Sequence, residues 1–450
     1  MPRMDRGFRR SALTGFWRAS GERTSLRQAV GALAVATSLG VGVPGIGHAQ
    51  NAVTDWASIV QPAIHNAGAP RPPASSEILH TILQLAVYDA VVAIEGGYEP
   101  YAAAIDAPAG ADVRAAVATA AYRTALGRVA SSQFAYLDGQ YASYLAGIPD
   151  GQAETDGIAV GEAAAAAMLA LRAGDGFNNA VLYSCSAVPP PYAEFEPNGG
   201  CGTQPVDAKV GQITPFTFSD PAGFLPRGPD PFTSNQWLRD YDEARDYGRS
   251  NSSVRSAEQT DIAYFWAEHT YVHWNRNLNQ LAIAEGLDTP DTARLLALAH
   301  TAASDAVIAG FHAKYSFRFA RPRTAIPRAA EDGNPDTVAD PTWTPLLTVN
   351  HPEYPSAHAF WSTALTDAVA RFFCTDEVTW TITTSQAAVP QLVQTQRTYT
   401  RLDQITEELD DARVWAGLHW RNSMKDGDKL GARVARHVLR SFRAGDDCGE

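Results

Sequence analysis

Long stretches with apolar residues at helical spacing are the feature that most restricts the fold of this chain. Ser76–Ile94 begins near a Ser-Ser-Glu start, and Ala111–Val129 and Ile158–Leu171 are rich in alanine. Later helices are predicted over Ser256–Gly286, Thr292–Phe319, Ser356 to about Phe373, Gln404–Arg421 and Lys429–Phe442, with one short strand over Val378–Thr383. Because period-two alternation is almost absent, the pattern predicts an all-α fold: a large helical bundle domain that could hold two four-helix bundles.

The first 49 residues have the pattern of a targeting segment. An arginine-rich leader precedes an apolar run from Ala29 to Val43, and Gly47-His48-Ala49 offers a cleavage site before Gln50. The run is too short and glycine-rich for a good membrane span, and no later stretch is predicted to cross a membrane. Arg9-Arg10 partly matches a twin-arginine signal, and ordinary Sec export fits as well. We expect a signal peptide over 1–49 and a soluble, exported domain over 50–450, periplasmic or secreted.

The net charge of the chain restricts the kinds of partner that it can bind. The whole chain has a formal net charge of −13, and removal of residues 1–49 takes away seven arginines and two acids, which leaves about −18. Such an acidic chain is a poor nucleic-acid binder, so we expect no nucleic-acid partner. A cationic pocket within it has to be local.

Four cysteines remain after the leader, and a long irregular segment lies around two of them. Cys185 and Cys201 flank a proline- and glycine-rich loop, so this pair is the favoured disulfide, with Cys374–Cys448 following by elimination. The alternative is four buried thiols; no spacing resembles a zinc or iron–sulfur site. The irregular segment covers residues 183–235, and it either lines a functional site or is a surface excursion far from the chemistry.

Three short motifs between Lys314 and His419 carry groups that suit a tetrahedral oxyanion. They are Lys314 with Arg321-Pro322, then Pro355-Ser356-Ala357-His358, then Arg413 with His419. Guanidinium and ammonium groups neutralise the oxygens of such an anion, and a hydroxyl and a helix-terminal N–H add directional hydrogen bonds. One imidazole can then bond the central atom while the other moves protons.

Each motif alone has a plainer interpretation. A lysine and an arginine on one helix usually form a solvated face, Ser356 could simply cap a helix with His358 in its first turn, and His419 could be a core histidine. The order and spacing of all three together favour a shared site.

That order and spacing resemble the superfamily of vanadium-dependent haloperoxidases and type 2 phosphatidic acid phosphatases, whose signature is K-x6-R-P, then P-S-G-H, then S-R-x5-H-x3-D. Ile78–Tyr98 and Phe265–Gly286 also resemble helices of the bacterial haloperoxidase-like branch. The resemblance implies that His358 is the acid–base residue and that His419 bonds vanadium or phosphorus. It also implies an oxyanion held by Lys314, Arg321, Ser356, the Ala357 N–H and Arg413.

The chain departs from this signature at three positions. Ala357 stands where the family usually has glycine, so its N–H can donate only if the backbone there is not left-handed. Ala412 replaces the serine before the third arginine, and Ser423 replaces the aspartate that orients the histidine. A histidine ligand needs a second-shell acceptor, so Ser423, Asp426 or a backbone carbonyl is expected to take that role.

The resemblance implies two activities, and the departures suggest a third function. The favoured one is an exported haloperoxidase that uses vanadate, hydrogen peroxide, a halide and a small organic acceptor, with Lys314 assisting catalysis. The alternative is an acid phosphatase that cleaves phosphomonoesters through a phosphohistidine at His419, since phosphate can occupy the same site. Ala357 and Ser423 suggest the third, a catalytically weakened oxyanion-binding protein.

Two further histidine features give local hypotheses. His351 precedes His358 by seven residues, where the family has His in algal bromoperoxidases and an aromatic residue in fungal chloroperoxidases. The resemblance therefore implies bromide or iodide oxidation; the alternative is that His351 only ends a loop. His269 and His273 lie four apart, as metal ligands can, but aromatic packing is favoured because no third ligand is close in sequence.

Overall fold

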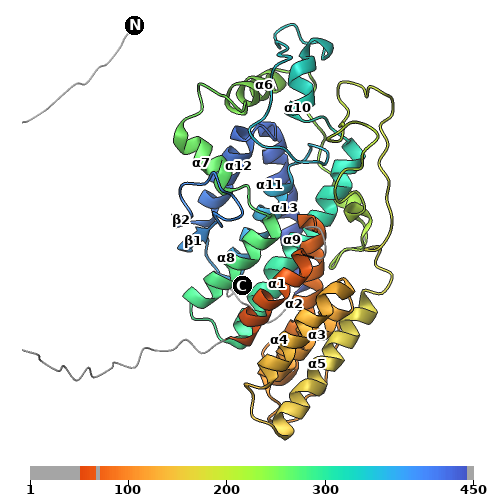
Figure 1. The fold of residues 1–450 in the computed structure, drawn as a ribbon, viewed down its shortest axis with the longest axis vertical. Coiled ribbons are helices and arrows are strands. Elements are labelled where there is room, and N and C mark those ends of the chain that lie inside the picture. The colour runs from red at the N-terminus through yellow and green to blue at the C-terminus, as the bar shows by residue number, and fades with distance from the viewer. Residues whose placement is uncertain (1–50, 67–70, 443–450) are drawn as a thin grey trace, which may run out of the picture. The chain divides into compact units, whose positions relative to one another are not determined.

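Two long buried helices, α2 (Pro73–Glu95) and α9 (Thr289–Phe317), pack against each other at the centre of the fold (Figure 1). The computed structural model describes residues 51–66 and 71–442, so the predicted signal peptide lies outside the described residues. Residues 74–92 and 292–311 are buried without a break. Such helices are apolar all round because other elements cover every face.

The same two helices are long and apolar enough to cross a membrane by length and composition. However, 83% and 94% of their most apolar windows are buried inside the protein. A helix in the core of a globular domain has this composition, and its neighbours here are other helices.

Small residues let the helices of the first half pack closely. This group comprises α1 (Ala52–His65), α2, α3 (Val113–Leu126), α4 (Phe134–Leu145) and α5 (Gln152–Leu171), coloured red to yellow in Figure 1. Helix α3 packs along α5. A Cβ added at Gly161 of α5 would lie 2.4 Å from the carbonyl oxygen of Ala116, so glycine is required there. The alanine-rich stretches are therefore packing faces.

A second group of helices follows in the second half of the chain. It contains α7 (Ala257–Phe265), α8 (Thr270–Ala284), α11 (Ala357–Phe373), α12 (Leu402–Trp415) and α13 (Arg421–Ser441). Its members α11 and α13 pack against α9. Helix α13 lies close to α11, since a Cβ at Gly431 would be 2.4 Å from the Phe360 carbonyl oxygen. Strands β1 (Trp380–Thr383) and β2 (Gln396–Tyr399) pair antiparallel as the sole sheet of the described residues. The all-α prediction is confirmed.

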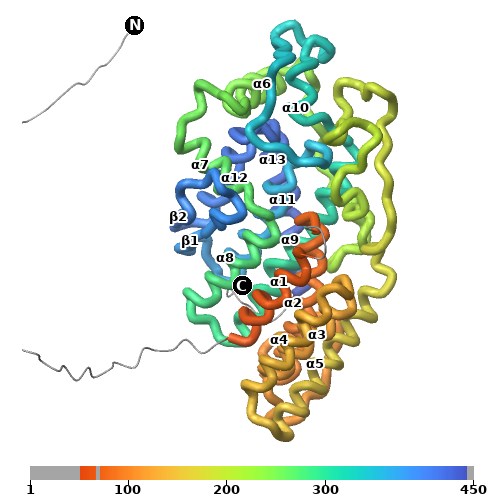
Figure 2. The backbone as a smooth tube through the Cα atoms, in the orientation of Figure 1, coloured from red at the N-terminus to blue at the C-terminus, as the bar shows by residue number. Residues whose placement is uncertain are grey.

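The segment between α5 and α6 (Asn235–Tyr247) is irregular, as predicted, apart from the short 3-10 turns Val210–Gln212 and Pro221–Phe224 (Figure 2). Cys185 and Cys201 form a disulfide within it. Cys374 is disulfide-bonded as well, and Cys448 lies outside the described residues. The short helix α10 (Pro322–Ala325) and the 3-10 turn Ile326–Glu331 follow α9. The 3-10 turn Ser131–Gln133 precedes α4.

Three predicted helices differ from those observed: the predicted Lys429–Phe442 belongs to α13, which already begins at Arg421, and the other two differences fall beside the three motifs. The predicted helix Ser256–Gly286 is divided between α7 and α8, and the Trp266 carbonyl at the break accepts a hydrogen bond from Arg413. The predicted helix Gln404–Arg421 ends at Trp415, because Gly417 adopts φ +72° and reverses the chain. His419 therefore lies in a turn between two helices.

Candidate active site

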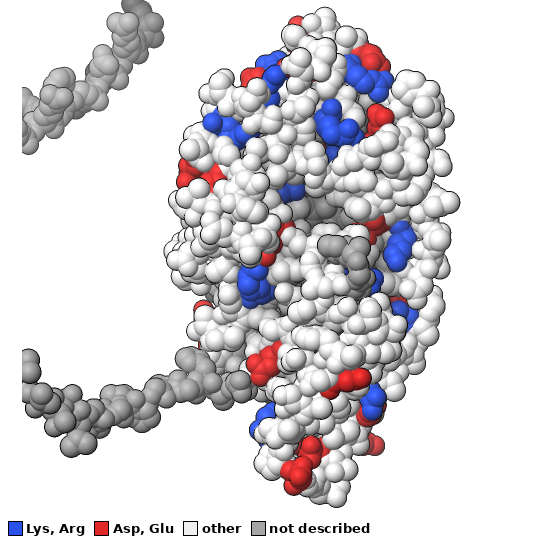
Figure 3. All heavy atoms as spheres, viewed as in Figure 1, with Lys and Arg blue, Asp and Glu red and all other residues white. Residues whose placement is uncertain are grey.

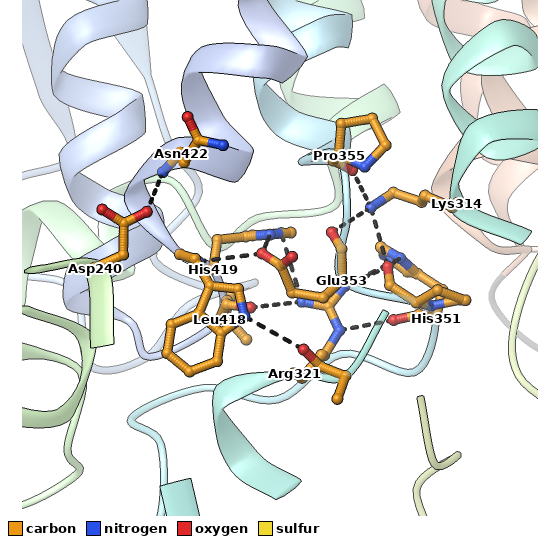
Figure 4. Close-up of polar contacts among 12 residues, drawn as sticks. Asp240, Lys314, Arg321, His351, Glu353, Pro355, Leu418, His419 and Asn422 are labelled. Atoms are coloured by element: carbon orange, nitrogen blue, oxygen red, sulfur yellow. Dashed lines mark hydrogen bonds and ion pairs between the residues drawn. The ribbon is translucent and has the colours of Figure 1, made fainter. Parts of the chain in front are cut away.

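The structure brings the three sequence motifs together at the ends of four helices. Lys314 lies in the last turn of α9 and Arg321 just before α10. Ser356 precedes α11, and Arg413 lies in the last turn of α12. Figure 4 shows Lys314 and Arg321 converging on the loop that contains His351 and Glu353, with His419 beside them. Helix ends leave carbonyl and N–H groups unpaired, so this is a place where polar side chains can be buried.

Lys314 is fully buried and holds the loop before α11. Its Nζ donates to the carbonyls of Pro352 at 3.0 Å and Glu353 at 2.9 Å, and also to that of Pro355. Burial, and then the neighbouring Arg321, lower the pKa of Lys314 well below its ordinary value. The lysine thus fixes the loop while placing its charge at the site.

Arg321 connects that loop to the turn that carries His419. Its Nε donates to the His351 carbonyl at 2.7 Å, and its Nη1 donates to the Leu418 carbonyl at 2.8 Å. The same Nη1 lies 3.5 Å from Nε2 of His419. Burial lowers the pKa of Arg321 to about 10. The planar guanidinium suits this role because its fork of donors can reach two loops at once.

His419 is oriented by Glu353, a residue that the sequence analysis did not assign. Nδ1 of His419 donates to Oε1 of Glu353 at 2.7 Å, and both side chains are 1% exposed or less. The same oxygen accepts the backbone N–H of Trp420 at 3.1 Å. Because this oxygen accepts the backbone N–H, it also acts as the acceptor in its contact with the imidazole. Nδ1 of His419 therefore carries the proton, and the lone pair of the ring is on Nε2. Burial raises the pKa of Glu353 to about 7, opposed by Arg321 and Lys314.

The expected orienting groups have other contacts. Asp426 accepts from the Tyr354 hydroxyl at 2.8 Å, and the Ser423 side chain interacts with Glu353 instead of with His419. The prediction that Ser423, Asp426 or a carbonyl orients His419 is therefore wrong. Glu353 lies between Pro352 and Pro355 in the loop directly before Ser356, and no local sequence signal marks it for this role.

Arg413, Ser356 and Ala357 supply donors that remain available. Arg413 is 2% exposed and donates through Nη1 to the Trp266 carbonyl, while its Nε has no partner among the described residues. The Ser356 hydroxyl is fully buried and likewise without a partner there. Ala357 begins a right-handed helix, so its N–H is one of the first-turn groups that no intrahelical carbonyl reaches.

His358 and His351 lie on one cavity of about 220 Å³. Nε2 of His358 is 3.2 Å from the Thr270 hydroxyl, and Nδ1 of His351 receives a hydrogen bond from Arg321 at 3.1 Å. The ring of His351 also contacts Phe311, with centroids 5.4 Å apart. Burial and the neighbouring cations lower the pKa of both histidines well below 6.5. Neutral imidazoles at this position can accept protons.

The balance of charge in the site favours an anion. Lys314, Arg321 and Arg413 are three buried basic side chains, and Glu353 is the acid that opposes the charges of Lys314 and Arg321. Uncompensated buried charge is costly, so a polyvalent anion would stabilise this arrangement. With the free Ser356 hydroxyl and Arg413 Nε, the set fits a tetrahedral oxyanion such as vanadate or phosphate.

His269 and His273, which were considered as metal ligands, contact aromatic rings and a backbone carbonyl instead. His273 lies against Trp266 and Trp274, with centroids 5.2 and 5.9 Å away. Nε2 of His269 is 2.8 Å from the Arg71 carbonyl. Within residues 51–66 and 71–442, no group of three or more His, Cys, Asp or Glu residues could hold a metal ion.

Charged residues elsewhere do not form a competing anion surface on the face that Figure 3 shows. Lysines and arginines there are scattered among aspartates and glutamates. On this face, cations do not gather as they do in the buried site.

Comparison with known proteins identifies the fold. Residues 294–444 match the VCPO second helical-bundle domain, and no curated protein matches the chain. Among solved structures, the chain is similar to a bacterial vanadium-dependent iodoperoxidase with 20% identity and a TM-score of 0.71, over 87% of this chain and 95% of that one. It is similar to a holo-type bacterial vanadium-dependent chloroperoxidase with 18% identity and a TM-score of 0.65, over 85% and 97%. The resemblance drawn from the three motifs is confirmed: the chain has the helical-bundle fold of the vanadium-dependent haloperoxidase superfamily.

Proposed function

We propose that this protein is an exported vanadate-dependent haloperoxidase that oxidises bromide or iodide with hydrogen peroxide. The observation that carries the proposal is the surplus of buried positive charge beside a histidine whose Nδ1 is fixed by Glu353. That arrangement puts the lone pair of His419 on Nε2, where it could bond a metal centre, and provides cations for the oxygens of that centre. The haloperoxidase fold and the second-bundle match support the same assignment.

The residues have separate roles in this proposal. His419 would attach vanadate through Nε2, and Lys314, Arg321, Arg413, Ser356 and the Ala357 N–H would hold its oxygens. Bound vanadate would supply Lewis acidity that activates peroxide toward halide without a change in the metal's oxidation state. His358 would accept the proton that peroxide releases: burial lowers its pKa, so the imidazole is neutral and has a free lone pair, and its ring reaches the cavity.

His351 supports the choice of halide. Its ring lies on the same cavity as His358, so it can hydrogen-bond peroxide or exchange protons with the acid–base residue. Arg321 donates to its Nδ1, which leaves Nε2 as the ring nitrogen for that contact. Equal turnover of bromide and chloride would count against this part of the proposal.

Vanadium loading and side-by-side assays test the proposal. The protein is purified with orthovanadate, its metal content is measured, and halide oxidation is assayed with peroxide. We expect about one vanadium per chain, as one His419 provides one attachment point, and peroxide-dependent oxidation of iodide and bromide. Phosphomonoester cleavage is assayed without vanadate. Rapid cleavage combined with no halide oxidation by the loaded protein would establish the phosphatase alternative, and binding without either activity would establish an oxyanion-binding protein.

A further inference from the structure

The irregular segment over residues 183–235 forms part of the cavity beside His358. Val206 and Asp207 line that cavity. The Val206 N–H donates to the Asn350 carbonyl at 2.8 Å, which ties the segment to the loop before α11. Of the two expectations for these residues, the structure therefore supports the one in which they line the site. The segment then leads into α6.

Helix α6 lies against the turn that carries His419. It packs against α12 and α13, the helices before and after that turn. A Cβ added at Gly248, which follows α6, would lie 2.6 Å from Cα of Gly417, and one added at Gly417 would lie 2.4 Å from the Gly248 carbonyl oxygen. The backbone at the end of α6 and the backbone of the turn are therefore in direct contact, and no side chain fits between them.

The residues directly after His419 also contact α6. The ring of Trp420 lies 4.7 Å from that of Trp237 and is stacked with that of Tyr241 at 6.3 Å, measured between centroids. Nη2 of Arg421 donates to Oε1 of Glu243 at 2.6 Å. Aromatic contacts and a charge-assisted hydrogen bond thus attach the end of the turn to one face of α6.

Asp240 of α6 caps the start of α13. The N–H of Asn422, the second residue of α13, donates to Oδ2 of Asp240 at 2.7 Å (Figure 4). The other oxygen of Asp240 accepts from the Gln236 side chain at 2.6 Å, and Asp240 is 3% exposed. Trp420 is the N-cap of α13 and provides no side-chain cap. The first N–H groups of a helix have no intrahelical acceptor, and a carboxylate is favoured there by the helix dipole as well.

The start of α13 is therefore held by two acids from different parts of the chain. Glu353 accepts the His419 Nδ1–H at 2.7 Å and the Trp420 N–H at 3.1 Å, while Asp240 accepts the Asn422 N–H. These three donors belong to four consecutive residues. A shift of the backbone at Asn422 would thus move Trp420 and His419 relative to Glu353, so the bond that orients His419 depends on the cap.

We propose that Asp240 is a positioning residue, which caps α13 and thereby holds His419 with Nδ1 at Glu353 and Nε2 at the oxyanion site. The proposal rests on the function proposed above, in which vanadate is attached to Nε2. Asp240 does not line the cavity beside His358, so it acts through His419 and not on a substrate. A site of this kind needs its groups held within roughly 0.5 Å, which makes the support behind a metal-binding histidine important.

Hydrogen exchange of the His419 Nδ1–H and of the Trp420 amide tests the positioning. Both are measured by NMR on the full protein without vanadate. In Asp240→Ala both should exchange about fivefold faster than in the parent protein, because loss of a typical helix cap raises the local opening constant by that order. Asp242→Ala is the matched control, since Asp242 lies on the same helix, carries the same charge and is 45% exposed. A change confined to the Asn422 amide would show a purely local cap and overturn the proposal.

A conservative variant keeps the test decisive if Asp240→Ala does not fold. In Asp240→Asn the amide oxygen can still accept the Asn422 N–H, but it is a weaker acceptor than a carboxylate. Its exchange rates should lie between those of the parent protein and Asp240→Ala, and above those of Asp242→Asn. Equal rates for the His419 Nδ1–H in Asp240→Asn and Asp242→Asn would overturn the proposal.

Vanadate affinity then tests the consequence for the site. By equilibrium dialysis, Asp240→Ala should bind orthovanadate about tenfold more weakly, the lower end of the loss expected when support behind a metal ligand is removed. Its affinity for inorganic phosphate should change less, because the cations hold phosphate without a bond to Nε2 of His419. Equal losses for the two anions would indicate displaced cations and overturn the proposal. If the parent protein binds no vanadate, the proposed function fails, while the exchange rates still decide whether Asp240 positions His419.

Discussion

Replacing Glu353 by glutamine separates the two contributions that hold an oxyanion at His419. The substitution keeps the size of the side chain, and the amide oxygen can still accept the His419 Nδ1–H and the Trp420 N–H, which lie 2.7 and 3.1 Å from the carboxylate. It removes the negative charge that opposes Lys314 and Arg321. It also weakens the acceptor that makes the imidazole a better ligand.

These two effects have opposite signs. Loss of the carboxylate charge leaves the cations unopposed, which favours any oxyanion. Loss of the charged second-shell partner typically weakens a metal site by about 10–100-fold, or roughly 1.4–2.7 kcal/mol. The first effect acts alike on vanadate and phosphate, because the two ions share shape and contacts. The second acts only on the ion bonded to Nε2. We therefore expect the ratio of vanadate to phosphate affinity to fall about 10–100-fold in Glu353→Gln.

Equilibrium dialysis with vanadium and phosphate quantification measures this ratio. It should be run near pH 8, above the pKa of about 7 that burial gives Glu353, so that the parent carboxylate is charged. Near pH 6, where the parent carboxyl is mostly protonated, the difference should shrink. Glu377→Gln is the matched control, since this side chain is 76% exposed and carries the same charge. An unchanged ratio at pH 8 would refute the assignment of Glu353 and His419 as one unit.

The same variant gives a stability test with a definite sign. Burial raises the folded-state pKa of Glu353 from 4.5 to about 7, so the folded protein holds a proton that the unfolded chain releases in this window. The unfolding free energy of the parent should therefore fall as pH rises from about 4.5 through 7, and Glu353→Gln should lack that component. Parallel melting curves of the two proteins across this range would contradict the raised pKa.

Two further predictions concern the histidines and the helix packing. His419→Ala should abolish tight vanadate retention, whereas His358→Ala should retain vanadate but lose about two to four orders of magnitude in turnover, as general acid–base help is removed; normal vanadate affinity in His419→Ala would refute the site. Gly310→Ala should lower the unfolding free energy by about 1–3 kcal/mol, because its Cβ would lie 2.2 Å from the Phe360 ring. Gly139→Ala, with nothing within 4 Å, should be neutral or slightly stabilising in a melting experiment; equal effects at the two glycines would contradict the packing argument.

The helices of the core were predictable because periodicity and caps are local signals. The predicted Ser356–Phe373 agrees with α11, and Thr292–Phe319 with α9, within a few residues. The failures occur where tertiary contacts decide. Gly417 turns the chain so that the Leu418 carbonyl can meet Arg321, a contact across nearly a hundred residues that no local pattern encodes. The break before α8 likewise places a carbonyl opposite Arg413.

Most residues of the site could be predicted from the sequence, but the hydrogen bonds that connect them could not. The spacing of the motifs indicated the cations and both histidines, and in the structure each histidine is close enough to Lys314, Arg321 and Arg413 for the cations to lower its pKa further, after burial. Glu353 was not assigned because its role depends on a partner 66 positions away. A lone acid in a proline-flanked loop has no local signature of orienting a histidine. The second-shell partner had to be sought near His419 in sequence, whereas the fold supplies it from the other loop.

The cations of this site also organise its backbone, which decides how substitutions should be interpreted. Lys314 donates to three carbonyls of the loop that carries Glu353 and leads into α11. Arg321 bridges that loop to the turn of His419. Removing either side chain would leave buried carbonyls without donors as well as remove a charge, so lost binding would mix two causes. Arg413 is the cleaner reporter, because one backbone contact holds it and its Nε remains available. Substitutions of Arg413 and Glu353 therefore test the oxyanion site most directly. Arg413 has a donor without a partner among the described residues, and Glu353 is an acid that the family signature does not contain.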